Sequence, residues 1–389
     1  MAGDAQALRA GPLAGVRVVE LAGIGPGPMC AMLLADLGAT VIRIDRKQPD
    51  ELGIKRPLRF NLLLRNRPVI ALDLKDPAGV EAALQLIERA DALIEGFRPG
   101  VTERMGLGPE TCLARNPRLA YGRMTGWGQD GPLAQTAGHD VNYIAITGVL
   151  NAIGRADQPP SIPLNLVGDY AGGSLYLAMG LLAAILSART TGRGQVVDAA
   201  IVDGTANLAT TFFGMFAAGM LNPARGTNLT DSGSHFYDVY QCADGGWVSV
   251  GPIEPKFYAE FLKTLGVDAA ALGAQNDPAN WPKAKALIAA RFREQPRDHW
   301  AALFAPTDAC VSPILSWEEA PRHEHLVARS TFIEVDGIAQ PAPAPRFSAT
   351  PTATPTPPAP VTAENTRAAL AQWLTADELA SWQSRGLID

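Results

Sequence analysis

The run Val16-Arg17-Val18-Val19-Glu20-Leu21 opens the stretch of sequence that decides the fold. Its β-branched residues predict a strand, and the apolar spacing of residues 29–37 then predicts a helix that ends at Gly38. Val41-Ile42-Arg43-Ile44-Asp45 is a second predicted strand. The order strand, helix, strand is a βαβ unit, so we expect a parallel sheet covered by helices.

Working outward from this unit, the sequence predicts two domains. Further strands at 69–74, 92–95 and 119–124, with a helix at 78–89, make residues 12–200 one large α/β domain. Residues 201–234 are expected to be a linker with an apolar helix at 207–220. Two short β-rich runs flank Asp244-Gly245-Gly246 and predict a hairpin, and Pro255 suits the first position of a helix at 256–265. These elements predict a smaller α+β domain over 235–325.

The last part of the chain reads as a connector followed by helices. Residues 326–360 are expected to form a return linker, extended over 340–360, where Pro, Ala and Thr dominate. Helical patterns follow at 363–374 and 376–385, with Thr375 as a candidate cap between them. Residues 361–389 therefore form a predicted C-terminal helical segment.

Composition disfavours several classes of protein. A formal net charge of −6 argues against a general nucleic-acid-binding protein. The longest apolar run, residues 175–186, is shorter than the roughly 20 residues that cross a bilayer, so we expect a buried helix and no membrane span. The cysteines are scattered without metal-ligand or disulfide spacing, which favours a reduced, cytoplasmic location with thiols that are either buried and inert or singly reactive. They are Cys30, Cys112, Cys242 and Cys310.

Three residues in glycine-rich surroundings are candidates for acid–base chemistry: His139, Asp169 and Glu254. A base of moderate pKa with two carboxylates is what proton abstraction beside a carbonyl requires. Each residue also has a purely structural interpretation. His139 could be a structural histidine, and Asp169 and Glu254 could cap helices. The catalytic interpretation requires that the three converge in space.

Two further patterns concern a ligand. Cations recur where strands end or loops begin, which favours an anionic ligand because open α/β sheets bind ligands outside the carboxyl ends of their strands. They are Arg46, Lys75, Arg98 and Arg104. The first predicted βα turn, residues 22–28, places glycines at alternate positions and does not match GxGxxG. A structural turn and a nucleotide contact both remain open there, and NAD binding is a weak interpretation.

The chain resembles the class III CoA-transferase superfamily, and within it the α-methylacyl-CoA racemases, over nearly its whole length. The motifs that carry the resemblance are Pro12–Ala22, Leu33–Ala39, Glu95–Gly100, Arg123–Gln129, Gly138–Asp140, Gly192–Asp198 and Tyr237–Glu254. The resemblance implies a Rossmann-like large domain and a small α+β domain joined by long linkers, with the C-terminal segment packed on the large domain. It further implies an interlocked homodimer in which Glu254 meets His139 across the subunit interface.

The resemblance also implies the chemistry. Transferases of the superfamily use the aspartate that matches Asp169 as a nucleophile, whereas its racemases use it as an acid/base and carry a histidine at the position of His139. The chain is therefore expected to interconvert (R)- and (S)-2-methylacyl-CoA by 1,1-proton transfer through an enolate, with Glu254 orienting the imidazole. Asp140 and Asn165 are expected to help position the substrate. A class III CoA-transferase with an Asp169 nucleophile is the alternative.

The same resemblance implies a CoA site. The matching positions are Ile24, Arg46, Leu72, Lys75, Gly96, Arg98 and Arg104. Cations suit the phosphates, and Ile24 and Leu72 would offer apolar contact to adenine. We expect backbone amides near the start of the helix after Asp169 to bind the enolate oxygen. No metal or redox cofactor is expected, since CoA is part of the substrate. A non-catalytic CoA-binding protein and a nicotinamide-dependent oxidoreductase are more distant alternatives.

Overall fold

The computed structural model describes residues 10–48 and 53–388. The chain divides into two compact units, each described here by itself. Unit 1 comprises the described residues up to Thr147, then Leu164–Leu208 and the residues from His325 onward, and unit 2 comprises Gly148–Pro163 and Ala209–Glu324. This division groups residues 148–163, expected in the large domain, with unit 2. It groups residues 201–208, expected in the linker, with unit 1.

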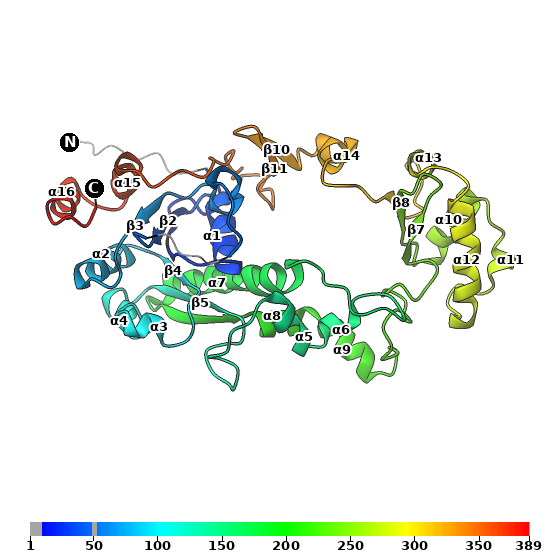
Figure 1. The fold of residues 1–389 in the computed structure, drawn as a ribbon, viewed down its shortest axis with the longest axis horizontal. Coiled ribbons are helices and arrows are strands. Elements are labelled where there is room, and N and C mark those ends of the chain that lie inside the picture. The colour runs from blue at the N-terminus through cyan, green and yellow to red at the C-terminus, as the bar shows by residue number, and fades with distance from the viewer. Residues whose placement is uncertain (1–9, 49–52, 389) are drawn as a thin grey trace. The chain divides into compact units, whose positions relative to one another are not determined.

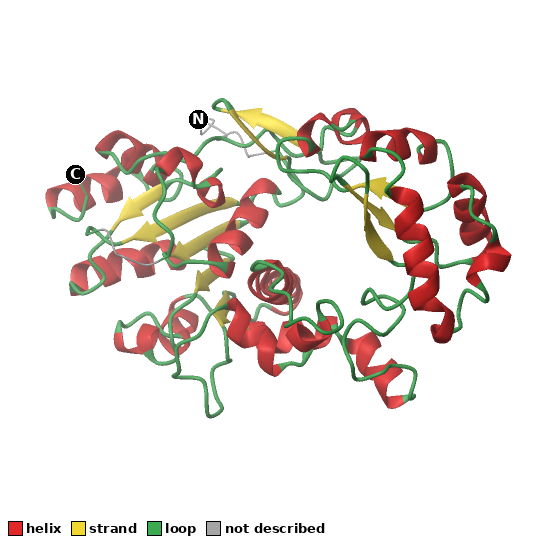
Figure 2. Cartoon of the chain, turned by 45° about the vertical axis from the view of Figure 1, so that its right-hand side comes forward, coloured by secondary structure: helices red, strands yellow, loops and turns green. Residues whose placement is uncertain are grey.

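Unit 1 is built on a six-stranded parallel sheet in the order β3-β2-β1-β4-β5-β6, drawn in yellow in Figure 2. The strands are β1 (Arg17–Leu21), β2 (Thr40–Asp45), β3 (Val69–Ala71), β4 (Ala92–Glu95), β5 (Ala120–Thr125) and β6 (Gln195–Ala200). This is the Rossmann strand order. Strands β2 and β3 are added on one side of β1 and strands β4 to β6 on the other, so the strand order reverses between β1 and β4. The parallel sheet expected from the βαβ unit is confirmed. The sequence did not predict β6, whose first residues are largely exposed.

Helices cover both faces of this sheet. On one face, α1 (Pro26–Asp36) and α7 (Tyr176–Thr191) pack with the strands. On the other, α2 (Pro77–Ile87) shares its core with α15 (Ala363–Leu370) and α16 (Ala376–Ser384), the red helices beside α2 in Figure 1. Unit 1 also holds η1 (Leu58–Phe60), η2 (Leu62–Leu64), α3 (Val101–Arg104), α4 (Pro109–Arg115), α5 (Asp140–Ile146), the π-helix η3 (Leu166–Leu175), α8 (Ile201–Leu208), β10 (Phe332–Val335) and β11 (Ile338–Pro341).

Buried polar contacts fasten the returning C-terminal segment to unit 1. The Arg65 guanidinium pairs with the Asp36 carboxylate and donates to the Gln340 side-chain oxygen at 2.9 Å. Asn66 exchanges backbone and side-chain hydrogen bonds with Thr356, at 3.1 and 2.8 Å. The prediction that the C-terminal helices begin after an extended segment is confirmed, because no helix or strand lies between residues 342 and 362. The predicted Thr375 cap forms a capping box with Glu378.

Unit 2 has its own aromatic core around an antiparallel sheet in the order β7-β8-β9. The predicted hairpin is confirmed as β7 and β8, and Pro255 occupies the first turn of α10 as expected. The single helix expected over 207–220 is instead two, α8 and α9, which meet at Ala209. The elements of unit 2 are α6 (Val149–Ala152), α9 (Thr210–Ala217), β7 (Asp238–Gln241), β8 (Trp247–Val250), α10 (Pro255–Leu265), α11 (Ala269–Leu272), η4 (Pro278–Asn280), α12 (Trp281–Phe292), α13 (Arg297–Phe304), β9 (Val311–Pro313) and η5 (Ala320–Arg322), with α14 (Glu324–Ala328) at the junction.

The apolar run at 175–186 belongs to a longer helical segment than expected. Within the described ranges, one segment, Leu166–Thr191, has the length and hydropathy of a membrane span, with 26 residues and a mean hydropathy of 1.7. A core helix passes the same test, and Leu177, Leu181 and Ile185 of α7 are buried against the sheet. One face of α7 is buried as expected, whereas Met179 and Leu186 of the same helix are exposed, and a membrane span is not indicated.

Three of the cysteines, Cys30, Cys112 and Cys242, are buried, and Cys310 is exposed. Burial raises the pKa of the Cys112 thiol to about 12 and that of Cys242 to about 11, and it also raises the pKa of Cys30. The pKa of Cys310 is raised by partial burial and by the nearby carboxylates of Glu254 and Asp308. These environments keep the thiols protonated near neutral pH, so the interpretation of inert cysteines is favoured.

His235 makes the stability of the protein depend on pH. It is fully buried in unit 2, where its Nε2 lies 2.7 Å from the Tyr258 hydroxyl. Burial, reinforced by Lys285, lowers its pKa from 6.5 to about 4. The unfolded chain then binds more protons between these pH values, so stability present above pH 6.5 is lost as the pH falls toward 4.

We predict that lowering the pH from 6.5 to 4 reduces the free energy of unfolding of both the wild type and His235→Gln. The reduction should be larger in the wild type, by on the order of 2 kcal/mol. Urea unfolding at a series of pH values measures the difference. Equal pH slopes for the two proteins would show that His235 does not titrate on unfolding.

Candidate active site

Asp169 lies inside the π-helix η3, four residues after the N-cap Asn165. The Asn165 side-chain amide donates to Asp169 Oδ2 at 3.2 Å. The alternative that Asp169 caps a helix is therefore wrong, because the helix begins before it and its carboxylate faces a side chain. π-Helical turns are uncommon and are found most often at functional sites.

Glycines let other elements approach this π-helix closely. A Cβ at Gly168 would lie 2.3 Å from Asp140 Oδ1, and a Cβ at Gly172 would lie 2.5 Å from Thr205 Oγ1 of α8. Gly204 on α8 is equally constrained, since its Cβ would meet the Gly172 carbonyl oxygen at 1.9 Å. Gly172 and Gly204 thus let η3 and α8 pack with their backbones close together, while Gly168 leaves room for the Asp140 side chain of α5.

Asp140 joins the helix that follows His139 to the helix that carries Asp169. Its Oδ1 accepts a hydrogen bond from the Asp169 amide at 2.6 Å, while its Oδ2 is buried without a partner. His139 is the N-cap of α5, and its amide donates to the Asn142 side-chain oxygen at 3.0 Å. Asp140 is buried and His139 is exposed. Asp140 therefore anchors the start of α5 to η3, whereas the His139 side chain is exposed to solvent.

Burial raises the pKa of both carboxylates. The pKa of Asp169 is raised, chiefly by burial; Asn165 lowers it, Asp140 raises it, and the charge of His139 lowers it. The pKa of Asp140 is likewise raised by burial, against hydrogen bonds from the amides of Asp169 and Gly168. Asp140 contacts the Asp169 amide and directly follows His139, so the segment that carries His139 lies beside η3. Hydrogen bonds thus join Asp140, Asn165 and Asp169, and the catalytic roles of His139 and Asp169 stay predictions.

The βα turn after β1 also reaches this site. Gly25 has φ of 66°, and a Cβ there would lie 3.3 Å from Asp169 Oδ2. Glycine is therefore favoured both by the left-handed backbone and by the approach of the carboxylate. Of the alternating glycines in this turn, Gly25 therefore lies beside the candidate catalytic carboxylate, which the sequence did not predict. The site lies where the strand order reverses, the expected position for a ligand.

Tyr143 is a second residue that sequence analysis missed. Its ring stands 4.7 Å from that of Trp127, edge to face, and its hydroxyl donates to the Gly138 carbonyl oxygen. A Cβ at Gly126 would lie 2.0 Å from the ring, so that glycine makes room for it. Burial raises the pKa of Tyr143 to about 12, with a further rise from Asp169 and a lowering from Arg98. Tyr143 thus packs against Trp127, Gly126 and Gly138, next to the segment that carries His139.

The predicted CoA residues follow the carboxyl ends of neighbouring parallel strands. Exposed positions come directly after β1, β2 and β4 at Ile24, Arg46 and the pair Gly96 and Arg98. Lys75 and Arg104 line a pocket of about 600 Å³ in unit 1. The other lining residues are Leu74, Pro77, Val80, Glu81, Leu84, Met105 and Gly106. One edge of the sheet therefore presents several cations near an open pocket, which suits a polyanionic ligand.

The expectation that the Leu72 side chain contacts adenine is wrong. Its side chain is only 1% exposed and belongs to the hydrophobic core of the α2 face. It is therefore not available for apolar contact with adenine. Its position directly after β3 still places its backbone near Lys75, whereas Leu74, which lines the pocket, offers an apolar side chain there.

Glu254 lies in unit 2 as the exposed N-cap of α10, and its side chain makes no capping hydrogen bond. The interpretation of Glu254 as a side-chain cap is therefore wrong, and its carboxylate stays available. Its meeting with His139 remains a prediction.

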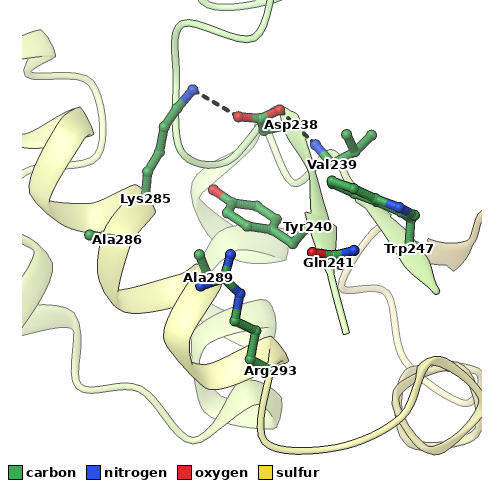
Figure 3. Close-up of a pocket in the computed structure, with 9 residues that line it drawn as sticks. All are labelled: Asp238, Val239, Tyr240, Gln241, Trp247, Lys285, Ala286, Ala289 and Arg293. Atoms are coloured by element: carbon green, nitrogen blue, oxygen red, sulfur yellow. Dashed lines mark hydrogen bonds and ion pairs between the residues drawn. The ribbon is translucent and has the colours of Figure 1, made fainter. Parts of the chain in front are cut away.

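Figure 3 shows a pocket of about 280 Å³ in unit 2, beside β7 and α12. Its charged contact joins Lys285 to Asp238 at 2.8 Å, and none of the predicted catalytic or CoA residues lines it. Across residues 10–48 and 53–388, no group of three or more His, Cys, Asp or Glu side chains is arranged to hold a metal ion.

Comparison with known proteins gives the family. The pattern of CoA-transferase family III matches residues 13–366. The chain belongs to this family. It is 42% identical to the α-methylacyl-CoA racemase of Mus musculus and 40% identical to that of Homo sapiens, in each case over 97% of both chains. A CAIB/BAIF family protein from Brucella suis shares the fold, with a TM-score of 0.80 and 26% identity over 94% of this chain and all of that one.

We predict that Gly168→Ala damages the candidate active site. The new Cβ would displace the Asp140 carboxylate from the Asp169 amide, lowering stability by roughly 1–3 kcal/mol and turnover by about tenfold or more. Thermal unfolding and turnover with an acyl-CoA measure the two effects. Gly214→Ala on α9 is the matched control, since its Cβ would meet nothing within 4 Å. Unchanged activity in Gly168→Ala would show that the Asp140–Asp169 contact is dispensable.

Proposed function

We propose that the chain interconverts (R)- and (S)-2-methylacyl-CoA thioesters by moving a proton at C2. The observation that supports this proposal is the hydrogen bond from the Asp169 amide to Asp140, the residue after His139, close to the turn after β1 where the strand order reverses. Identity of 40–42% to two α-methylacyl-CoA racemases over nearly the whole chain supports the same reaction. Proton transfer of this kind needs no metal or redox cofactor.

His139 and Asp169 act as the acid–base pair. One removes the α-proton from one face of C2 and leaves a planar enolate, and the other returns a proton to the opposite face. The raised pKa of Asp169 brings the carboxylate closer to the range in which it both accepts and donates protons. Asn165 holds one of its oxygens by a hydrogen bond of 3.2 Å and thereby fixes the direction of the carboxylate.

The donors for the enolate oxygen differ from those expected. The amides beside Asp169 are already used: its own donates to Asp140, and that of Tyr170 donates to the Asn165 carbonyl oxygen at 3.3 Å. In α5 the amides of Asn142 and Tyr143 already donate to the His139 carbonyl oxygen, at 2.8 and 3.3 Å, which leaves the amides of Asp140 and Val141 at the very start of the helix as the better candidates. They are oriented by the same helix that presents the imidazole.

Glu254 enters this mechanism if a second copy of the chain completes the site. The described surface includes many exposed apolar side chains on α7 and α9, as an extensive interface between subunits would require. Those with exposed fractions of 50% or more are Leu175, Met179, Leu186, Phe212, Phe213 and Phe216, counting Leu175 at the start of α7. We therefore include a homodimer in the proposal, with Glu254 of one subunit orienting and stabilising the charged form of His139 in the other.

A CoA-transferase reaction is the second candidate, favoured by the name of the family itself. In that reaction Asp169 would attack the thioester carbonyl and carry the acyl group, so its partly buried carboxylate fits both mechanisms. His139 separates them, because a transferase requires no proton removal at C2.

The first test follows one enantiomer of a 2-methylacyl-CoA in deuterated water. We expect deuterium to enter at C2 together with epimerisation. The absence of exchange, with CoA moving instead to an added carboxylic acid, would make the chain a transferase.

His139→Ala tests the assignment of the acid–base pair. We expect it to lower racemisation by about 10²–10⁴-fold, because a positioned acid or base contributes that much, while CoA binding is retained. His325→Ala, in the exposed helix α14, is the matched control and should leave racemisation unchanged. Near-normal racemisation in His139→Ala would remove His139 from the mechanism.

A further inference from the structure

Glu95 is a buried carboxylate that the proposed chemistry does not use. It is the last residue of β4 and is 0% exposed, at the centre of the sheet beside β1 and β5. A buried carboxylate is costly unless hydrogen bonds compensate it, so its contacts indicate what it does. The loop that follows it, residues 96–100, carries Gly96 and Arg98, both predicted to contact CoA.

Both oxygens of the Glu95 carboxylate are engaged. Oε2 accepts a hydrogen bond from the amide of Phe97, two residues further on, at 2.7 Å. Oε1 accepts from Nε of Arg123 on β5 at 2.9 Å. The first contact folds the carboxylate back onto its own loop, between Gly96 and Arg98. The second fixes the carboxylate to the neighbouring strand, so the start of the loop is tied to the sheet.

Arg123 extends this connection to α3. Its terminal nitrogens donate to the Glu103 carboxylate at 2.8 and 3.3 Å. Glu103 directly precedes Arg104, whose Nη1 would lie 3.1 Å from a Cβ at Gly100, which has φ of 81°. The chain of contacts Glu95–Arg123–Glu103 therefore links the loop of Arg98 to the helix of Arg104.

We propose that Glu95 is a positioning residue that holds residues 96–100 and α3 so that Arg98 and Arg104 face the phosphates of CoA. This rests on the proposed function in its requirement for a CoA site, but not on the choice between racemase and transferase. Glu95 itself touches no substrate atom in this proposal. It acts through the Phe97 amide and the Arg123 guanidinium, both of which require an acceptor.

The protonation of Glu95 gives the proposal a distinctive signature. Burial raises its pKa to about 7, against lowering by the Phe97 amide and Arg123, and Glu103 raises it further. Tyr121 on β5 also senses its charge. Above pH 8 the carboxylate is ionised and accepts both hydrogen bonds, and as the pH falls through 7 it gains a proton and loses one acceptor. CoA binding should therefore weaken in step with this protonation.

Glu95→Gln keeps the shape of the side chain and imitates the protonated acid at every pH. Calorimetry with free CoA measures binding without any catalytic step. We expect Glu95→Gln to bind CoA about tenfold more weakly than the wild type at pH 8.5, the effect of losing an acceptor for charged and backbone donors. The ratio of the two dissociation constants should fall toward one by pH 6, because the wild-type residue is then protonated as well.

Two further variants distinguish the positioning role of Glu95 from a general effect of removing a carboxylate. Glu103→Gln leaves the Glu95–Phe97 contact in place and should weaken CoA binding less than Glu95→Gln does, with no comparable dependence of the ratio on pH. Glu88→Gln, at an exposed ion pair with Arg115, should leave binding unchanged. A Glu95→Gln ratio that stays near one at pH 8.5, or that is large but constant with pH, would overturn the proposal. If the wild type binds no CoA, the proposed function fails and this inference fails with it.

Discussion

The hydrogen bond between the Asp169 amide and the Asp140 carboxylate is the contact on which the candidate site depends. It joins two helices whose sequences are separated by the excursion of residues 148–163 into unit 2. It also requires glycine at 168, because any larger side chain would occupy the position of the carboxylate. The geometry of the acid–base pair is therefore fixed by backbone contact and one buried acid.

The charged residues around the sheet form a buried group and an exposed group. Buried carboxylates at the strands, Glu20 and Glu95, pair with arginines of neighbouring strands and segments, whereas exposed arginines and a lysine follow the strand ends. The buried pairs organise the backbone, and the exposed cations give the carboxyl ends of the strands a positive charge that suits an anion.

The sequence predicted the parallel sheet, the hairpin of unit 2, the start of α10 at Pro255 and the cap at Thr375. These features were predictable because each of them is determined by residues close together in the chain. The motifs around His139, Asp140, Asn165 and Asp169 singled these residues out, and the hydrogen bonds of Asp169 to Asn165 and Asp140 agree with a shared site, while their roles stay predictions. Tertiary packing decided the rest. The π-helix depends on its close approach to Gly204, Tyr143 depends on space left by Gly126, and the burial of Leu72 depends on helices at the other end of the chain.

The burial of Leu72 by helices near residue 370 affects how the chain folds while it is being synthesised. The six strands are complete by Ala200, but the core on the α2 face includes Leu370, Trp373 and Trp382 from the C-terminal segment. During synthesis this face of the sheet is covered only in part, by α2 and α4, until residues 363–388 have also left the ribosome. Apolar surface that stays exposed in this interval favours aggregation, so the release of α15 and α16 ends that exposure.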